Sequence, residues 1–572
     1  MDKRRNSLFN PSRYLESPAI NFLGILLFLL SVIALSLLTM FRGVGIYDDS
    51  VFLTIARGIT QDLVPYLDLF DTKPPGVYYL FAAVGGNFGG AWWVPRLFLC
   101  LVNIIFIGVF FYRIRRDVPE TVAWWSASIF TLSLLIVKAY QVNTRVFAAV
   151  FASLGLITVY GSEYRSLLRN LIFGFFIGLA GLFNQQGYFY LIAFGFVYLV
   201  DSLVRRRSIK IIVTHLALVS IVSMIPLVIV FGYYWHIKTS RAFFEATIFQ
   251  SVPFLIPGKR QPFDKNRLIT QLTRFPALLL SLFLVFSHLI LHSTSLWKTL
   301  RNYIRNKNVG VRRPIATATR AMLKKIAEAL TQPHFLLWVT AIFGMSTIVV
   351  RYFSNHMALA VFPLSYLCAV LCADLRHSFG QKLGIRFGLD TILTVLLAAM
   401  LVVIWREGPL RALQEGRLGI DMQQGREFYA ELSRCLEPDD RILVISSTPP
   451  RLYYLTQHYP PWRWLYIDDS NDNLVRWKDA LDLIDAESIP AVMIEDRLYF
   501  KWPASYRGRP LPPKYEAFRA KLEQSYFPVD LEYSYHPIHR TYTEMYISQF
   551  ATCGRLVDQY PLFPNLYLYP VR

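Results

Sequence analysis

The stretch Tyr47–Ala83, YDDSVFLTIARGITQDLVPYLDLFDTKPPGVYYLFAA, contains five aspartates, one arginine and one lysine and follows closely on a long apolar run. That run, Ile20–Phe41, is long enough for a full membrane span of about 20 residues, and a basic N-terminal segment precedes it. Basic segments stay on the cytoplasmic side of a membrane. We therefore predict a signal anchor with a cytoplasmic N-terminus, which places the charged stretch at the outer face.

The composition of the whole chain is that of a membrane protein. Of its 572 residues, 54% are hydrophobic and only 17% are charged, whereas soluble domains carry about 25% charged residues. This excludes a soluble single domain, a disordered chain and a disulfide-rich secreted module. The net charge of +20 arises from Lys and Arg clusters between apolar runs, which indicates membrane orientation rather than nucleic-acid binding.

The apolar runs predict an α-helical polytopic membrane module over residues 1–405, with about eleven transmembrane helices. The basic clusters alternate with weakly charged loops, so the N-terminus is predicted inside and the C-terminus outside. The first outer loop is 42–91, and a longer polar outer loop spans 236–273. After Ile20–Phe41, the predicted spans are 92–112, 119–137, 146–160, 170–183, 187–204, 210–233, 274–293, 334–350, 357–375 and 387–405.

One apolar segment, Val77–Gly90, is too short for a span and is interrupted by four glycines. Counting it as a span would move the basic cluster at Arg113, Arg115 and Arg116 to the outer face. We therefore predict a short re-entrant or amphipathic piece at the outer interface.

Residues 406–572 predict a C-terminal α/β domain outside the cytoplasm. Two short apolar runs, Arg441–Ser446 and Pro490–Ile494, are typical of buried strands. Helical spacing of apolar residues predicts helices over Gln423–Cys435, Leu474–Ala486 and Lys514–Gln524. Cys435 and Cys553 would lie in an oxidising compartment, which leaves open either a disulfide or two free thiols.

The first outer loop contains the candidate chemistry. The pair Asp48-Asp49 follows the first span, and Asp68, Asp71 and Lys73 come later in the loop. Ionisable groups at a membrane face are costly and are often functional. The alternative is a solvated loop whose charges pair with one another, for example Lys73 with Asp71.

The loop resembles that of the GT-C glycosyltransferases that depend on polyprenyl phosphate, in particular the protein O-mannosyltransferase and aminoarabinose-transferase superfamily. In that family an acidic pair, a Pro-Tyr element and a Lys-Pro-Pro motif follow the first helix. Here these are Asp48-Asp49, Pro65-Tyr66 and Lys73-Pro74-Pro75-Gly76. More weakly, Arg351–His356 resembles an outer-loop segment of the family, and Asp439–Arg463 resembles part of its periplasmic domain.

The resemblance implies transfer of a sugar from a polyprenyl-phosphate donor to a hydroxyl acceptor at the outer face of a bacterial inner membrane. Asp48 matches the position of the base, which takes the proton of the acceptor, and Asp49 would orient the acceptor or support Asp48. Lys73 matches the cation for the leaving phosphate. Arg351 and His356 are weaker candidates for the phosphate. The remaining substrate-binding candidates are Tyr66, Asp71 and Arg145.

No cofactor is predicted, and no His/Cys cluster has the spacing of metal ligands. Cys368 and Cys372, one turn apart in a span, are interpreted as packing residues. Related sequences often have an acidic residue where this chain has Arg145, and a lysine where it has Asn184. Three other functions stay open: a transporter or flippase of lipid-linked sugars, a non-catalytic cell-envelope assembly protein, and a polysaccharide polymerase or ligase that uses the same kind of lipid donor.

Overall fold

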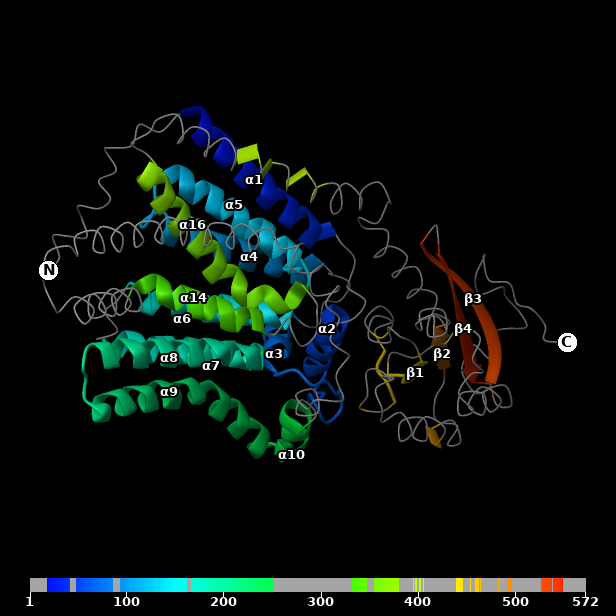
Figure 1. Ribbon diagram of the computed structural model, residues 1–572. Helices are drawn as coiled ribbons and strands as arrows, with labels where there is room; N and C mark the ends of the chain where they lie inside the picture. Colours follow the sequence, from blue (N-terminus) through cyan, green and yellow to red (C-terminus); the bar gives the residue numbers. More distant parts are fainter. Residues whose placement is uncertain are drawn as a thin grey trace, which may run out of the picture.

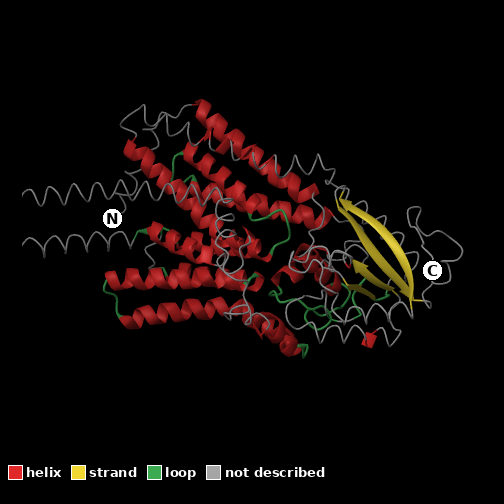
Figure 2. Cartoon of the chain, turned by 45° about the vertical axis from the view of Figure 1, so that its right-hand side comes forward, coloured by secondary structure: helices red, strands yellow, loops and turns green. Residues whose placement is uncertain are grey.

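The computed structural model is a bundle of helices with a small β-sheet beyond one end (Figure 1). Figure 2 shows the same division, with the strands gathered on one side of the helices. The structure describes most of the predicted membrane module and parts of the C-terminal region. The described residues are 18–41, 48–85, 93–161, 166–249, 332–346, 354–379, short pieces between 394 and 405, 439–445, 453, 458–461, 463, 482–483, 491–495, 526–536 and 539–548.

The apolar runs form helices where the sequence predicts them. Within the described residues, five helices are long and apolar enough to cross a membrane, and shorter apolar helices pack beside them. The predicted spans 274–293 and most of 387–405 lie outside these residues. In chain order the bundle contains α1 (Pro18–Phe41), α4 (Trp93–Ile114), α5 (Glu120–Ile136), α6 (Thr144–Val159), α7 (Leu167–Phe183), α8 (Phe189–Val204), α9 (Ile209–His236), α14 (Pro333–Ser346) and α16 (Ala358–Phe379).

Helix α16 lies at the centre of the bundle, and α9 lies at its margin. In the most apolar window of α16, 94% of the residues are buried, compared with 17% in α9. The exposed residues of α9 are large and apolar, including Ile209, Val228 and Ile229. An apolar exposed face of this kind suits contact with lipid tails.

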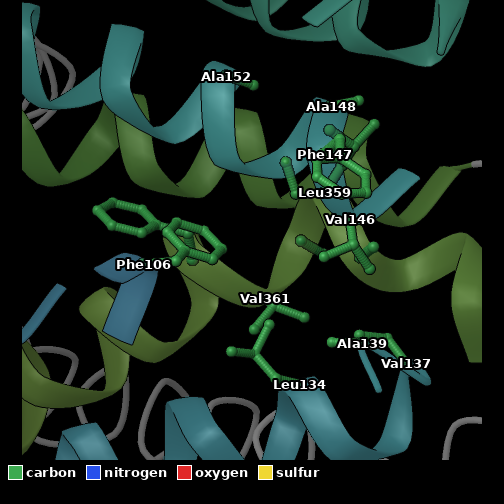
Figure 3. Packing of buried hydrophobic residues seen from close by; sticks show 14 of the residues in the cluster. Phe106, Leu134, Val137, Ala139, Val146, Phe147, Ala148, Ala152, Leu359 and Val361 are labelled. Atoms are coloured by element: carbon green, nitrogen blue, oxygen red, sulfur yellow. The ribbon is translucent and has the colours of Figure 1, made fainter. Parts of the chain in front are cut away.

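Aromatic rings fill the space between α16 and its neighbours. Phe110 of α4 stacks on Phe130 of α5, with ring centroids 4.3 Å apart. Phe362 of α16 meets the edge of Phe110 at 5.5 Å, and Phe106 lies stacked on Phe362 at 6.2 Å. Figure 3 shows Phe106 near other side chains of this core. Within a membrane the gain from such rings comes mainly from close packing, because lipid tails are as apolar as the side chains.

Glycines let α7 and α9 approach each other closely. A Cβ on Gly178 would lie 2.3 Å from the carbonyl oxygen of Ser223, and one on Gly174 would lie 2.6 Å from that of Val219. The spacing of Gly174 and Gly178 is that of the small-residue motif of membrane helix pairs, in which packing replaces the hydrophobic effect as the driving force.

Two short helices lie at the end of the bundle that faces the sheet (Figure 1). They are α2 (Asp48–Ile59) and α3 (Gly76–Gly85), both from the first outer loop. Helix α3 confirms the short helical piece predicted from Val77, although residues 86–92 lie outside the described part of the chain. After α9, the short helices α10 (Ser240–Phe244) and η4 (Glu245–Phe249) begin the predicted outer loop 236–273.

The C-terminal sheet has the strand order β1-β2-β4-β3. Strands β1 (Ile442–Ile445) and β2 (Ala491–Glu495) are parallel, and both confirm predicted strands. Strands β3 (Tyr526–His536) and β4 (His539–Ser548) form an antiparallel hairpin that the sequence analysis does not predict. Residues 406–438, which include Cys435, lie outside the described residues, as does Cys553. Of the three predicted helices of this region, only residues 482–483 are described. The boundary at about residue 405 therefore stays a prediction.

Candidate functional site at the sheet-facing end of the bundle

The two adjacent carboxylates at the start of α2 lie in different environments. Both belong to the first turn of the helix, where the helix dipole favours negative charge. All ten residues of Asp49–Gly58 are buried, so α2 is enclosed on every side from Asp49 onward. Asp49 is 2% exposed, whereas Asp48 is half-buried.

Asp49 is held inside the protein by a buried arginine. Arg96, in the first turn of α4, donates from Nη2 to Asp49 Oδ2 at 2.6 Å. The other carboxylate oxygen accepts a hydrogen bond of 2.7 Å from the backbone N–H of Val142. Arg96 also donates to the carbonyl oxygen of Tyr140, at 3.3 Å. Asp49 therefore connects α2 to α4 and to the loop between α5 and α6, which we call the second outer loop.

Asp48 has no such tie within the described part of the chain, where no hydrogen bond or ion pair holds its carboxylate. Its neighbour fixes the helix, and Asp48 remains at the helix N-terminus with one side open. A partly exposed carboxylate on a fixed backbone can accept a proton from a bound hydroxyl group.

The loop between α2 and α3 begins with a tight turn at Pro65-Tyr66. Asp68 Oδ2 accepts from the N–H of Val64 at 2.7 Å, and the N–H of Tyr66 donates to the carbonyl oxygen of Leu69 at 2.8 Å. Tyr66 has a φ of 71°, in the left-handed region that a large side chain rarely adopts. Such a conformation costs about 1–3 kcal/mol and persists only where surrounding contacts fix it.

Tyr66 uses its hydroxyl inside the loop. The side chain is fully buried against Tyr234 of α9 and Phe243 of α10. Its hydroxyl donates to the carbonyl oxygen of Lys73 at 2.8 Å. Burial raises the pKa of Tyr66 well above its usual value, and the nearby charge of Asp71 adds to the effect. The hydroxyl therefore stays protonated and continues to donate at any physiological pH.

Asp71 is also buried and holds the backbone of the Lys73 segment. Its Oδ2 accepts from the hydroxyl of Tyr78 in α3 at 2.6 Å, and its Oδ1 accepts from the N–H of Thr72 at 2.7 Å. The Lys73 ammonium lies 3.9 Å from Asp71 Oδ1, at the outer limit of an ion pair. Lys73 and Asp71 thus pair only loosely, and Asp71 is buried. Both observations argue against a solvated loop in which these two charges simply pair.

Lys73 keeps part of its charge accessible. Its side chain is 21% exposed, compared with 4% for that of Asp71. Nζ makes one long hydrogen bond of 3.4 Å to the hydroxyl of Thr72. An ammonium group has three donors, so this arrangement leaves donor capacity for an anion.

Gly76 ends the Lys-Pro-Pro-Gly motif at a point of close backbone approach. A Cβ at this position would lie 2.7 Å from the carbonyl oxygen of Leu182, near the end of α7. Any other residue would push the loop away from the bundle. The glycine therefore sets the distance between the Lys73 segment and α7.

The second outer loop lies next to these residues. Asn143 caps α6, because its side chain accepts from the N–H of Arg145 at 2.9 Å. Arg145 is 6% exposed and donates from Nε to Gln186 Oε1 at 3.3 Å. Asn184 donates from Nδ2 to the hydroxyl of Thr144 at 3.1 Å. The two positions that depart from the family pattern, Arg145 and Asn184, thus belong to one polar cluster at the start of α6.

His356 is 3% exposed and lies in the short helix η7 (Ser354–Met357), which packs against α6. Arg351 lies outside the described residues. Within these, no group of three His, Cys, Asp or Glu side chains is placed to hold a metal ion. Cys368 and Cys372 are both buried in α16, and neither forms a disulfide within the described residues.

Three residues that connect the elements at this end of the bundle are not among those predicted from the sequence: Arg96, Arg57 and Tyr459. Arg96 lies in an apolar run that gives no hint of a partner. Arg57 of α2 is 5% exposed and donates from Nε to the hydroxyl of Tyr459 at 2.9 Å. The two residues are 402 positions apart. An arginine and a tyrosine can form such a contact, but the sequence contains nothing that identifies these two residues as partners.

No protein-family model matches the sequence, and no curated protein matches it in sequence. Among solved structures, ArnT from Cupriavidus metallidurans in the apo state is similar over 91% of this chain and 97% of that chain, with a TM-score of 0.53 and 14% identity. ArnT bound to undecaprenyl phosphate is similar over the same shares, with 14% identity and a TM-score of 0.50. A third similar structure is the archaeal oligosaccharyltransferase AglB from Archaeoglobus fulgidus, in complex with an inhibitory peptide and a dolichol-phosphate. Its TM-score is 0.42 at 11% identity, over 90% of this chain and 74% of that chain.

At such identities the likeness is one of fold. The expected fold is confirmed, and the chain is a polytopic membrane protein with the GT-C fold.

Proposed function

We propose that the protein is a membrane glycosyltransferase that moves a sugar from a polyprenyl-phosphate donor to a hydroxyl acceptor at the outer face of a bacterial inner membrane. The observation that carries the proposal is that some ionisable side chains of the first outer loop are used in internal contacts and others are not. Asp49, Tyr66 and Asp71 are committed to internal contacts, while Asp48 and Lys73 on the same loop keep accessible charge.

In the proposed displacement reaction, Asp48 acts on the attacking hydroxyl group and Lys73 acts on the leaving phosphate. The acceptor hydroxyl gives its proton to the Asp48 carboxylate and attacks the anomeric carbon of the donor sugar. A new C–O bond forms as the bond from the anomeric carbon to the phosphate oxygen breaks. The phosphate leaves with the bonding electron pair, and Lys73 neutralises its charge. Positioned donors of this kind are worth more in a water-poor site than in water.

The other candidate residues take supporting roles in this proposal. Asp49 fixes the helix that presents Asp48, and Tyr66 and Asp71 fix the backbone of Lys73. Arg145 and His356 lie at the start of α6 and in η7, where they would contact the donor phosphate or the acceptor. Arg351 stays a candidate for the phosphate. The likeness to ArnT over 91% of the chain supports a lipid-phosphate donor.

A transfer assay in membranes tests this proposal. Radiolabelled polyprenyl-phosphate sugars are supplied to membranes containing the native protein, Asp48→Asn or Asp62→Asn. Asp62 is an exposed residue of the same loop, and its φ of 62° suits Asn as well as Asp, so it is a matched control. We expect transfer by the native protein and Asp62→Asn, and a loss of about 10²–10⁴-fold in Asp48→Asn.

Two other outcomes would change the proposal. Transfer by Asp48→Asn at the native rate would keep the enzyme and move the base to another residue. No transfer by the native protein from a broad panel of donors would overturn the enzyme and favour the transporter or the non-catalytic assembly protein.

A further inference from the structure

Four residues from the C-terminal region contact the first outer loop, and we refer to Tyr453, His458, Tyr459 and Arg463 together as the strap. Arg57, in the last turn of α2, donates to the Tyr459 hydroxyl at 2.9 Å and to the carbonyl oxygens of Tyr453 and His458 at 3.2 and 3.4 Å. Tyr453, His458 and Tyr459 are each less than 9% exposed. The guanidinium also lies over the Tyr459 ring, 4.7 Å from its centroid.

The strap is anchored to the sheet. The N–H of Ile442 in β1 donates to the carbonyl oxygen of Tyr459 at 3.0 Å. The guanidinium of Arg441 lies 5.4 Å from the centroid of the same ring. Tyr459 therefore contacts two arginine side chains, one from α2 and one next to β1. It connects the sheet to α2 through these contacts.

A second contact lies closer to Lys73. The N–H of Phe70 donates to the carbonyl oxygen of Arg463 at 2.5 Å, and the Arg463 guanidinium lies 5.3 Å from the Phe70 ring centroid. The same guanidinium pairs with Glu245 Oε1 at 3.2 Å. Phe70 precedes Asp71, which holds the Lys73 backbone. The strap thus touches the loop on both sides of the Pro65-Tyr66 turn.

Arg57 lies where the loop leaves α2. Its carbonyl oxygen accepts from the N–H of Thr60 at 3.0 Å, and the chain then turns back so that the N–H of Leu63 meets the carbonyl oxygen of Gly58 at 2.9 Å. A shift of Arg57 would move the start of the loop, while a shift of Arg463 would move its far end. The two contacts lie at residues 57 and 70 of the loop, and Lys73 follows the second of them by three residues.

We propose that the strap is a positioning element for the phosphate-binding site: Arg57 and Tyr459, together with Arg463, hold the loop so that Lys73 meets a polyprenyl phosphate in a fixed geometry. This rests on the proposed function only in taking Lys73 as the phosphate cation. None of the strap residues contacts the phosphate; they act through the loop.

The test measures phosphate binding separately from transfer. Undecaprenyl phosphate is titrated against the full-length protein in detergent, and its dissociation constant is obtained from thermal shifts. The variants are Arg57→Ala, Tyr459→Ala, the double variant, and the milder Tyr459→Phe and Arg463→Ala. Arg116→Ala is the matched control, because Arg116 lies 4.2 Å from the ring centroid of Tyr112 at the other end of α4 and bonds its hydroxyl.

We expect Arg57→Ala and Tyr459→Ala each to raise the dissociation constant at least fivefold. In free energy, the double variant should lose less than the sum of the two single losses, because the Arg57–Tyr459 contact is common to both variants. Tyr459→Phe, which keeps the ring, should lose less than Tyr459→Ala. In the transfer assay the same variants should raise the donor KM more than they lower kcat. Arg116→Ala should bind like the native protein.

Additive losses in the double variant, or native affinity in Arg57→Ala and Arg463→Ala, would overturn the strap proposal. A native protein that binds undecaprenyl phosphate but transfers no sugar would overturn the enzyme and leave the strap standing on its binding data. A native protein that does not bind undecaprenyl phosphate would overturn both.

Discussion

Arg96 and Asp49 form an ion pair with a nitrogen–oxygen distance of 2.6 Å, and each side chain is only 2% exposed. The remaining carboxylate oxygen is bound by the N–H of Val142. A buried charge is tolerated only when it is paired and hydrogen-bonded, and Asp49 meets both conditions. The pair makes α2 a fixed part of the bundle, although α2 is a short helix from an outer loop.

Removing one partner of this pair should destabilise the protein strongly. Arg96→Met keeps most of the side-chain volume but leaves Asp49 buried without its counter-charge. We expect a loss of about 3–5 kcal/mol in the free energy of unfolding, measured as a lower melting temperature in detergent.

Two further variants isolate the charge effect. Arg115→Met, at an exposed position just after the same helix, should melt like the native protein. Adding Asp49→Asn to Arg96→Met should recover part of the loss, because the unpaired charge is gone. No recovery in the double variant would mean that packing of the Arg96 side chain, rather than its charge, stabilises α2.

Replacing Lys73 with glutamine should weaken binding of undecaprenyl phosphate. A hydrogen bond to a charged group is worth about 1.5–3 kcal/mol, which is about 10–150-fold in affinity. Lys138→Gln serves as the control, because Lys138 is an exposed lysine near the second outer loop. Unchanged affinity in Lys73→Gln would move the phosphate to other cations, Arg145 and Arg351 first.

The hydroxyl of Tyr66 should matter less at high pH than at neutral pH. Tyr66→Phe keeps the ring packing and removes the hydrogen bond to the Lys73 carbonyl, at a cost of about 1 kcal/mol. The pKa of Tyr66 is raised in the folded protein, whereas an unfolded tyrosine titrates at about pH 10. The stabilising contribution of the hydroxyl is therefore complete below pH 10 and falls as the pH rises above it.

We accordingly expect the melting temperatures of the native protein and Tyr66→Phe to differ at pH 8 and to converge between about pH 10 and 11. The comparison is made within one pair of proteins, so other tyrosines that titrate in this range affect both equally. A difference that grows with pH would contradict the assigned direction of the pKa shift.

The predicted orientation is open to a direct measurement. A reporter fused after Arg572 that is active only outside the cytoplasm should show activity, and one fused before the first span should not. A cytoplasmic C-terminus would overturn the count of about eleven helices and the outer-face site together with it.

The sequence was sufficient to predict the helices and the parallel strands but not the hairpin. Helices α4 and α9 begin and end within a few residues of the predicted spans, because a membrane span needs a long apolar run that few other structures share. Strands β1 and β2 are short apolar runs and were found in the same way. Strand β3 contains Pro528, Asp530 and Glu532, and a proline within a run argues against a strand.

The site was predictable in its residue types but not in their division of roles. Asp48 and Asp49 are neighbours in sequence, and only the positions of Arg96 and of the Val142 N–H show which one is buried. Lys73 was found through its motif, whereas the contact of Arg57 with Tyr459 spans 402 residues. No local pattern encodes such a contact, because each partner is an ordinary residue in its own segment.

The distance along the chain between Arg57 and Tyr459 has a consequence for biosynthesis. Ribosomes add about 5–20 residues per second, so the 402 residues between the partners take about 20 to 80 s to synthesise. Throughout that time the first outer loop is made and inserted but lacks its last contacts. The proposed function therefore predicts that a newly made protein becomes active only after its C-terminal region has been made and has reached the loop, and that truncated or stalled products stay inactive toward the lipids around them.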